Sequence, residues 1–273
     1  MARWLAMTFL CLATCLSAHA GSKILGTGAV SPIEGGAGGG IAPWALITGY
    51  GSDGEWGGSV FHTRVEVDDF GLDVSGVAVG WQDRLELSYA RQTLDVQGLS
   101  LDIEQDVVAA KYRLAGELLY SSIPQVSLGV QHKNNRDFAV PELLGADDDT
   151  GTDVYLAASK LWFAALARRN LLVNAAVRYT HANETGLLGF DDDASVVFEG
   201  SAVVFLNDRW VAGVEYRQKP DHLRAVEETD WWHVFTGYFP NKHFSVVLAR
   251  ADLGDIAGFE DQTGWYLSLQ GHM

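Results

Sequence analysis

Cysteine is nearly absent from this chain of 273 residues, and both cysteines, Cys11 and Cys15, lie within residues 1–20. That segment has the features of an export signal, because residues 5–16 are mostly apolar and the Ala-His-Ala at 18–20 matches a small-residue cleavage site. Its removal would leave no cysteine. Disulfide bonds, thiolate nucleophiles and cysteine metal sites are therefore excluded from the remaining chain.

Long apolar runs and basic residues are also scarce. The apolar run in the signal segment has about 12 residues, fewer than the roughly 20 that a membrane-spanning helix needs. No later stretch is apolar for that length, so no membrane-spanning helix is predicted. Arg3 is the only charged residue in the signal segment, which leaves 18 Lys and Arg against 35 Asp and Glu, a net charge of −17. This acidity argues against nucleic acid as a partner.

Proline is rare, and what the chain has in abundance is alternation of apolar and polar residues. In residues 209–217, one face of a strand reads Trp, Ala, Val, Tyr and the other reads Arg, Val, Gly, Glu, Arg. All six prolines lie at strand starts or in connections, as their missing N–H groups require. The same alternation predicts thirteen strands, at 42–50, 58–67, 72–81, 84–92, 105–115, 124–133, 153–163, 171–182, 195–206, 209–217, 230–239, 243–250 and 263–272.

The strand count decides how the N-terminal part is interpreted, because bacterial single-chain membrane barrels have an even number of strands. Residues 23–30 are a weaker strand candidate that would raise the count to fourteen. Treating 42–50 as a plug or linker would lower the count to twelve. Fourteen is favoured, because residues 44–50 alternate like a strand face. The predicted organisation is a signal peptide at 1–20, a Gly-rich segment at 21–41 and an all-β antiparallel transmembrane barrel at 42–273.

Long and short connections alternate along the chain, as they do in transmembrane barrels. Two long connections contain aspartate triplets, at 147–149 and 191–193, and these loops would be extracellular. The apolar faces of three strands begin and end with aromatic residues six positions apart, a spacing of about 20 Å along a strand. That is close to the roughly 25 Å apolar band between aromatic girdles, and the predicted girdle residues are Trp44, Tyr50, Trp210, Tyr216, Trp232 and Tyr238. Lipid is thus expected outside, although a soluble barrel with its apolar face inward remains the alternative.

Several segments together resemble the proteobacterial outer-membrane family known as domain of unknown function 3034 (DUF3034). The resemblance covers nearly the whole chain after residue 20, and its carriers are GGAGGGIAPW at 35–44, GTDVYLAASKL at 151–161, TGLLGF at 185–190, FEGSA at 198–202, VEYRQKPD at 214–221, FPNKH at 239–243 and DLGDI at 252–256. The resemblance implies export and a barrel, and it implies no activity. This chain departs from the family at its last residues, QGHM at 270–273, where the family shows a terminal aromatic residue.

The polar strand faces would line the lumen of such a barrel. The charged residues predicted there are Arg64, Glu66, Arg84, Glu86, Lys111, Arg113, Lys133, Arg178, Glu199, Glu215 and Arg217. These charges either line a passive, porin-like pore or pair across the lumen and seal it, because unpaired charges in a dry interior are costly. A sealed structural or surface-interaction barrel is therefore the alternative to a pore.

An outer-membrane lipid-modifying enzyme is the second alternative, but catalytic chemistry finds little support in the sequence and no catalytic residue is assigned. His181 faintly resembles part of the His-x-Ser-Asn stretch of membrane lipid hydrolases, but Asn183 stands where the serine nucleophile would be needed. The remaining histidines and the aspartate triplets lack metal-ligand spacing, and the glycine run at 35–40 lacks the residues of a phosphate loop. No cofactor or metal is expected. The expected partners are outer-membrane lipid and the barrel-assembly machinery.

Overall fold

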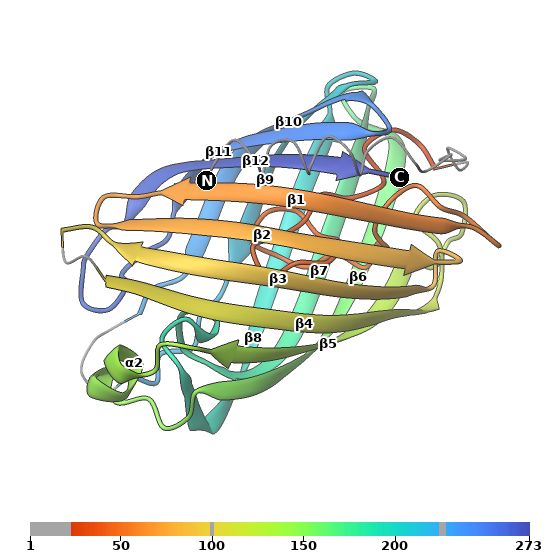
Figure 1. Ribbon diagram of the computed structural model, residues 1–273. Helices are drawn as coiled ribbons and strands as arrows, with labels where there is room; N and C mark the ends of the chain where they lie inside the picture. Colours follow the sequence, from red (N-terminus) through yellow and green to blue (C-terminus); the bar gives the residue numbers. More distant parts are fainter. Residues whose placement is uncertain (1–22, 99–100, 224–227) are drawn as a thin grey trace, which may run out of the picture.

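The computed structural model describes residues 23–98, 101–223 and 228–273, and these form a closed β-barrel of twelve antiparallel strands (Figure 1). Each strand pairs with its neighbours in sequence, and β12 pairs with β1 to close the barrel. The strands are β1 (Trp56–Glu66), β2 (Phe70–Trp81), β3 (Leu85–Val96), β4 (Leu101–Ala115), β5 (Gln125–Asn135), β6 (Thr150–Leu166), β7 (Arg169–Ala182), β8 (Phe190–Phe205), β9 (Trp210–Arg217), β10 (Trp231–Asn241), β11 (Phe244–Asp252) and β12 (Thr263–His272). Two short helical segments lie in connections, α2 (Ala139–Leu144) and η1 (Asn183–Gly186). Among the described residues, no helix is long and apolar enough to cross a membrane.

The favoured count of fourteen strands is wrong, because the barrel closes without the two N-terminal candidates. β1 pairs directly with β12, with Glu66 opposite Trp265. The segments at 23–30 and 42–50, predicted as strands, form no strand of the barrel. The other twelve predicted strands correspond to β1–β12, so the all-β antiparallel barrel itself is confirmed. The predicted signal peptide lies outside the described residues.

Most of the long connections lie at one end of the barrel. This end, here called the long-loop end, carries the connections 136–149, 218–230 and 253–262, and the opposite end carries tight turns such as 206–209. β8 begins at Phe190, so the aspartates at 191–193 belong to a strand and not to a loop. The alternation of long and short connections is weaker than predicted, because β3, β4 and β8 extend into segments expected to be loops.

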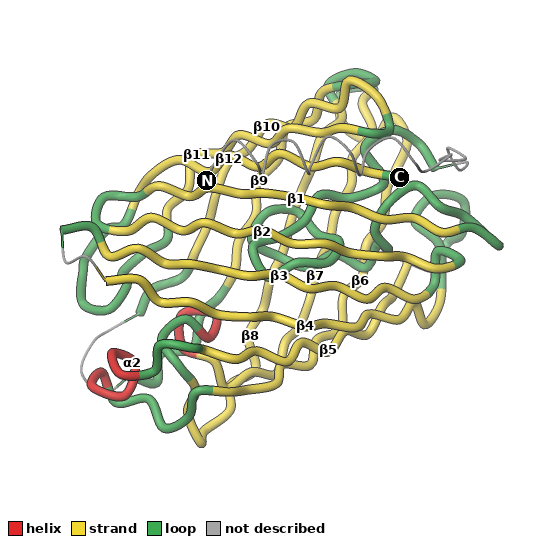
Figure 2. Tube along the Cα trace, in the orientation of Figure 1, coloured by secondary structure: helices red, strands yellow, loops and turns green. Residues whose placement is uncertain are grey.

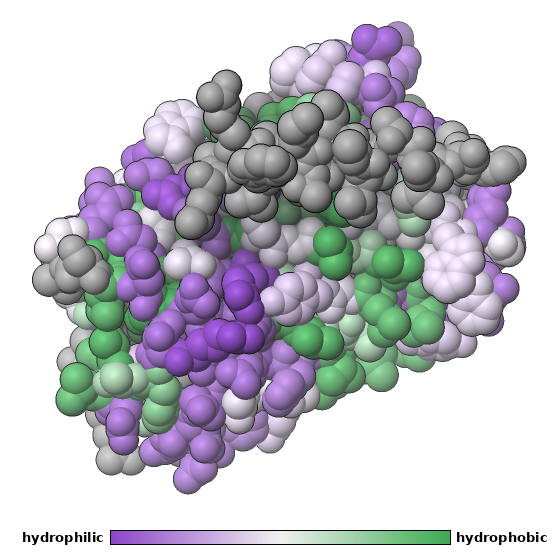
Figure 3. Space-filling view, viewed as in Figure 1, coloured by the Kyte–Doolittle hydropathy of each residue, from purple (hydrophilic) through white to green (hydrophobic). Residues whose placement is uncertain are grey.

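The two faces of the wall differ in polarity. In β9, the side chains of Trp210, Val214 and Tyr216 are exposed, whereas Val211 and Glu215 are buried. Exposed apolar side chains alternate with buried ones on the other strands as well. In the view of Figure 3, hydrophilic residues gather at the lower left, near α2, and hydrophobic residues gather further right along the strands. The apolar face therefore points outward, as in a barrel surrounded by lipid.

Residues 23–50, here called the plug, run through the interior of the barrel (Figures 1 and 2). Every residue from 26 to 50 is buried. The plug contains turns and isolated bridges, including Val30 paired with Gly38, but no continuous strand. Because it is buried on all sides, its composition is almost entirely apolar or glycine.

The interior at the long-loop end is also filled. Leu187 of the connection between β7 and β8 and Ile256 of the connection between β11 and β12 are buried. They belong to one hydrophobic cluster with Val65 and Phe70 from the wall. Burial of such aliphatic and aromatic side chains stabilises a fold by about 1.5–3 kcal/mol per residue. The lumen thus holds the plug and, at the long-loop end, buried residues of these connections.

Candidate functional site in the plugged lumen

Most of the charges predicted to line the lumen do point inward. Within the wall, the buried members of that set are Glu86, Lys111, Lys133, Arg178, Glu199, Glu215 and Arg217. Arg113 is half-buried and pairs with Asp83 near the short-turn end. The lumen therefore has a charged belt, and the positions of these residues decide whether the belt leaves an opening.

Three predicted lumen residues lie elsewhere. In β1 the inward residues are Phe61, Thr63 and Val65, so Arg64 and Glu66 point outward and form an ion pair on the outer surface. A strand shifted by one residue exchanges its two faces, and the apolar packing of the odd-numbered residues selects this register. Arg84 is exposed in the turn between β2 and β3.

Two predicted girdle residues are also misplaced. Trp44 and Tyr50 belong to the plug and are buried inside the barrel, with exposed fractions of 4% and 1%. Their six-residue spacing matched a lipid-facing strand by coincidence. The four other predicted girdle residues, Trp210, Tyr216, Trp232 and Tyr238, lie on the outward faces of β9 and β10.

Glu34 of the plug lies at the centre of the charged belt. Arg217 donates to both of its carboxylate oxygens, with Nη1 2.6 Å from Oε2 and Nη2 3.0 Å from Oε1. Arg178 donates from Nη2 to Oε2 at 3.0 Å, and Lys133 donates to Oε1. All four side chains are at most 5% exposed. We call Lys133, Arg178 and Arg217 the cradle, and all three bind the carboxylate of Glu34.

Two acidic side chains of the wall pair with cations of the cradle. Asp153 accepts from Lys133 Nζ at 2.7 Å and from Arg178 Nη1 at 2.9 Å. Glu199 accepts from Arg178 Nε at 2.6 Å. The three cations therefore face three acids, counting Glu34, and the cluster is neutral overall. Neutrality is what a buried ionic cluster requires.

Other wall carboxylates bind the backbone of the plug. Glu215 accepts from the N–H groups of Gly40 at 2.6 Å and Ile41 at 3.0 Å, and also from the indole of Trp44 at 3.0 Å. His233 Nε2 lies 3.0 Å from the same carboxylate. These bonds satisfy polar groups of a segment that has no sheet ladder of its own.

A second wall carboxylate binds the plug in the same way. Glu86 accepts from the N–H groups of Ala37 at 3.0 Å and Thr48 at 2.7 Å. Lys111 forms an ion pair with Glu86 at 3.0 Å and donates to the carbonyl of Leu46 at 3.0 Å. The plug is thus held at several points along its length by charged side chains of the wall.

The glycine run permits the plug to approach the wall closely. A Cβ atom added at Gly39 would lie 1.7 Å from Oε1 of Glu215, and one at Gly40 would lie 2.5 Å from Cε1 of His233. Such contacts are impossible for any side-chain-bearing residue without movement of the wall. The run therefore serves close approach of the plug backbone to the wall inside the lumen.

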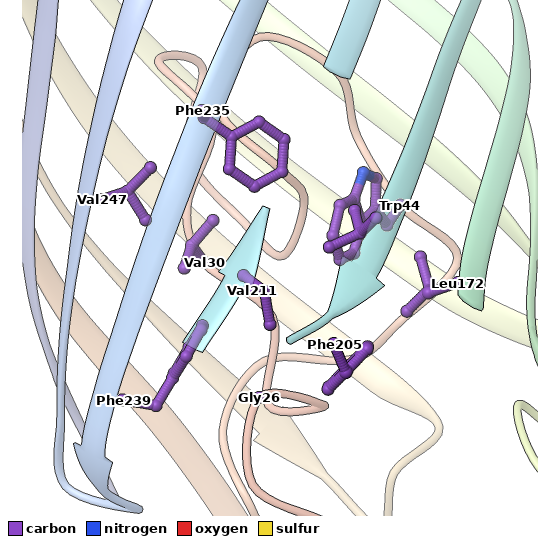
Figure 4. Close-up of a pocket in the computed structure, with 10 residues that line it drawn as sticks. Gly26, Val30, Trp44, Leu172, Phe205, Val211, Phe235, Phe239 and Val247 are labelled. Atoms are coloured by element: carbon purple, nitrogen blue, oxygen red, sulfur yellow. The ribbon is translucent and has the colours of Figure 1, made fainter. Parts of the chain in front are cut away.

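Apolar contacts hold the plug on another side. Trp44 and Val30 face Phe235, Val211 and Leu172 of the wall around an apolar cavity of about 20 Å³ (Figure 4). A second cavity, of about 10 Å³, lies beside the cradle. Cavities of this size hold one or two water molecules at most.

A buried acidic pair lies at the long-loop end. Glu184 of η1 forms an ion pair with Lys219 at 2.7 Å, and its backbone N–H donates to Glu228 at 3.3 Å. Burial, reinforced by repulsion from Glu184, raises the pKa of Glu228 to about 8. Burial also raises the pKa of Glu184, against the opposing effect of Lys219. These groups join the connections 183–189 and 218–230.

His181, the residue weighed for lipid hydrolysis, is half-buried on the outward face of β7. Its Nδ1 atom lies 2.9 Å from the carbonyl oxygen of Asp191, and its ring packs edge-on against Tyr179. Asn183 donates to the carboxylate of Asp191 at 2.6 Å. In the described part of the chain, no group of three or more His, Cys, Asp or Glu residues is arranged to hold a metal ion.

Sequence reasoning missed Glu34, although one signal was present. Glu34 is the only charged residue between Lys23 and Asp53. A lone acid in an otherwise apolar and glycine-rich segment indicates a buried carboxylate with a specific cationic partner. The sequence does not say which cations those are, because the contacts join residues about 100 to 180 positions apart.

Solved structures with a similar fold are outer-membrane barrels. The KdgM porin matches with a TM-score of 0.53 and 12% identity over 78% of this chain and 98% of that chain. The NanC porin matches with a TM-score of 0.50 and 13% identity over the same shares. The COG4313 outer membrane channel from Pseudomonas putida F1 matches with a TM-score of 0.47 and 12% identity over 82% of this chain and 96% of that chain. The likenesses to the two porins concern the fold alone.

No curated protein sequence matches this chain significantly. Residues 27–270 match the model of a family described as protein of unknown function (DUF3034). The match spans nearly all of the plug as well as the barrel, and it confirms the resemblance carried by the sequence motifs. The chain therefore belongs to the DUF3034 family.

Proposed function

We propose that this outer-membrane β-barrel is a gated solute channel whose passage is closed by the plug. The observation that carries the proposal is the attachment of Glu34 to three cations of the wall by hydrogen bonds and charge. Buried charges are costly, and apolar residues of similar volume would often seal an interior equally well or better. A charged attachment that can exchange partners is what a movable segment needs.

A permanently open, passive pore agrees less well with the plugged lumen than a gated channel does. In the closed conformation, two cavities beside the plug have volumes of about 20 and 10 Å³, and every residue of the plug from 26 to 50 is buried. Solutes larger than water therefore require the plug to move. Permeation would follow a population shift between a closed and an open state, and only interactions that differ between the two states would change it.

A sealed structural barrel is the second candidate, and the apolar contacts of the plug favour it. Trp44 is 4% exposed, which is as deeply buried as the aromatic residues in the core of a stable domain. Burial of this ring among Val211, Phe235 and Leu172 stabilises the closed state. The balance between these apolar contacts and the charged belt determines whether the plug ever leaves.

Conductance across planar bilayers distinguishes the two candidates. A disulfide between cysteines introduced by Gly35→Cys and Ala90→Cys would tether the plug to β3, because a Cβ at Gly35 lies 3.2 Å from Cβ of Ala90, near the usual Cβ separation of about 3.5–4.5 Å. Gly35 has a φ of +82°, so a cysteine there is strained and folding of the reduced variant is checked before conductance is measured. No native cysteine follows residue 20 to interfere. Wild-type protein is expected to show infrequent, discrete openings under applied potential. The oxidised tether is expected to abolish them, and reductant is expected to restore them.

A variant that lacks residues 24–48 serves as the positive control, since it should conduct continuously if it assembles. Heat-modifiable migration on gels checks that each variant has folded. If this deletion conducts but the wild-type protein never opens, the channel proposal is wrong and the sealed barrel stands. Openings that persist in the oxidised tether would show that the plug is not the gate.

A further inference from the structure

The seat of Glu34 has the geometry of a carboxylate-binding site. Arg217 offers both arms of its guanidinium to the two carboxylate oxygens at 2.6 and 3.0 Å. Arg178 adds a third N–H at 3.0 Å, and the ammonium of Lys133 adds a fourth donor. Paired, parallel N–H donation from arginine is specific for planar anions such as carboxylates.

The cations of this seat belong to the wall, whereas the carboxylate belongs to the plug. Lys133, Arg178 and Arg217 lie on β5, β7 and β9, whose positions are fixed by the sheet. Asp153 and Glu199 orient two of the cations independently of Glu34. Lys133 and Arg178 would therefore keep their positions without Glu34, and Arg217 would keep Glu199 as its nearest wall acid, at 3.9 Å. Three cations would then face two acids. One positive charge would be left without a partner.

A small cavity adjoins the cradle on the side of the long loops. It has a volume of about 10 Å³, and its lining includes Arg178 and Arg217 as well as Lys219 of the connection 218–230. The cradle thus lies at the base of the loops that close this end of the barrel. A solute that enters from the long-loop end would meet these cations when the loops and the plug yield.

We propose that the cradle is a carboxylate-binding site of the channel and that Glu34 occupies it in the closed state. A solute that bears a carboxylate takes the place of Glu34 when the plug moves. This inference rests on the proposed function and names its solute class, small organic carboxylates. Because such a solute binds only where Glu34 has left, its binding also favours the open state.

The test replaces Glu34 by alanine and supplies acetate, which has the same carboxylate as the missing side chain. A ligand that binds only the folded state stabilises it by RT ln(1 + [L]/Kd), so the dependence of the unfolding midpoint on ligand concentration gives the concentration of half-saturation. In detergent micelles, acetate is expected to raise the unfolding midpoint of Glu34→Ala. Half-saturation is expected at a concentration at least about tenfold lower than in wild-type protein, where Glu34 competes. Chloride at equal ionic strength measures the effect of an anion without a carboxylate.

Glu215→Gln is the matched control. It removes another buried glutamate that holds the plug to the wall, but it leaves Glu34 in the cradle. Its unfolding midpoint is expected to respond equally to acetate and chloride. If Glu34→Ala fails to fold, the isosteric Glu34→Gln variant is tested in the same way. Equal responses to acetate and chloride in the Glu34 variant, or an acetate response as strong in Glu215→Gln, would overturn the inference.

The binding experiment in micelles tests the carboxylate site and the conductance experiment in bilayers tests the channel, so either proposal can be refuted without the other. An acetate-specific response without any wild-type opening would support the carboxylate site and refute the channel proposal. Wild-type openings together with equal acetate and chloride responses would retain the channel and show that the cradle only holds the plug.

Discussion

Glu228 is a buried carboxyl group with an unusually high pKa of about 8, raised first by burial and then by repulsion from Glu184. In the unfolded chain its pKa would be near 4.5. A pKa that is higher in the folded state gives a contribution to stability that is complete below about pH 4.5 and is lost as the pH rises through 8. The connections that Glu184 and Glu228 join are therefore expected to loosen in mildly alkaline solution.

Glu228→Gln tests this expectation, because glutamine keeps the shape and the acceptor oxygen but does not titrate. Amide hydrogen exchange in residues 183–189 and 218–223 is compared between the variant and wild-type protein at each pH from 5 to 9. Protection in wild-type protein should fall relative to the variant as the pH rises towards 9. The charged groups that face Glu228, which are Glu184, Lys219 and Asp221, are the same in both proteins. A constant ratio of protection across this range would contradict the expectation.

Trp44 illustrates, at the scale of the element, how the plug differs from the strand that alternation predicted. As a girdle residue, Trp44 would lose only interfacial contacts on replacement by alanine. In the plug, its ring is buried and its indole donates to Ser201 at 2.9 Å and Glu215 at 3.0 Å. Trp44→Ala is therefore expected to destabilise the plugged barrel by about 3–5 kcal/mol, the usual cost of removing a core aromatic side chain.

Trp210→Ala is the matched control, since Trp210 is an outward residue that is 42% exposed. Urea titration of both variants in the same detergent gives the two losses of folding free energy. The loss in Trp210→Ala should be clearly smaller. Equal losses would mean that the plug contributes little to the stability of the barrel.

The contrast between the plug and the wall strands explains which parts of the fold the sequence alone could predict. In β9, residues 210–217 alternate because one face is apolar outside and the other meets the interior, so the period of two reports a physical boundary. Residues 44–50 alternate too, but every one of them is buried, and the pattern there reports no boundary. Periodicity therefore identified twelve strands and added 42–50, which is not a strand, and the requirement for an even count then added 23–30, which is not a strand either.

The sequence predicted the cations of the candidate site but not the acids Glu34 and Asp153. Alternation placed Lys133, Arg178 and Arg217 on the inner faces of their strands without any knowledge of the fold. It did not supply Glu34, because the plug has no period, nor Asp153, which lies near the start of its strand. In β1 the apolar residues Phe61 and Val65 fill the interior, contrary to the expectation of a polar lumen, and this reversed the prediction for Arg64 and Glu66.

At the scale of the whole molecule, we propose that the exposed apolar face of the barrel contacts outer-membrane lipid. Val214 is 49% exposed and lies between Trp210 and Tyr216 on the outward face of β9. It pairs with Val234 of β10 and Ala202 of β8, so its surroundings are apolar. Charged residues near the midplane of a lipid-facing barrel surface cost about 2–4 kcal/mol.

Val214→Arg is therefore expected to lower the folding free energy in phospholipid vesicles by about 2–4 kcal/mol, measured by urea titration with heat-modifiable gel migration as the signal of folding. Asn134→Arg is the control, because Asn134 is exposed at the long-loop end of β5, opposite Thr150, where the neighbouring side chains are polar. Near the membrane interface the same charge costs only about 0–1 kcal/mol. If both variants lost equally little, the outward face of β9 would not be in contact with lipid. A large loss confined to Val214→Arg would place the apolar band in the hydrocarbon core, because only the absence of water makes the cost of an arginine depend on its height along the barrel.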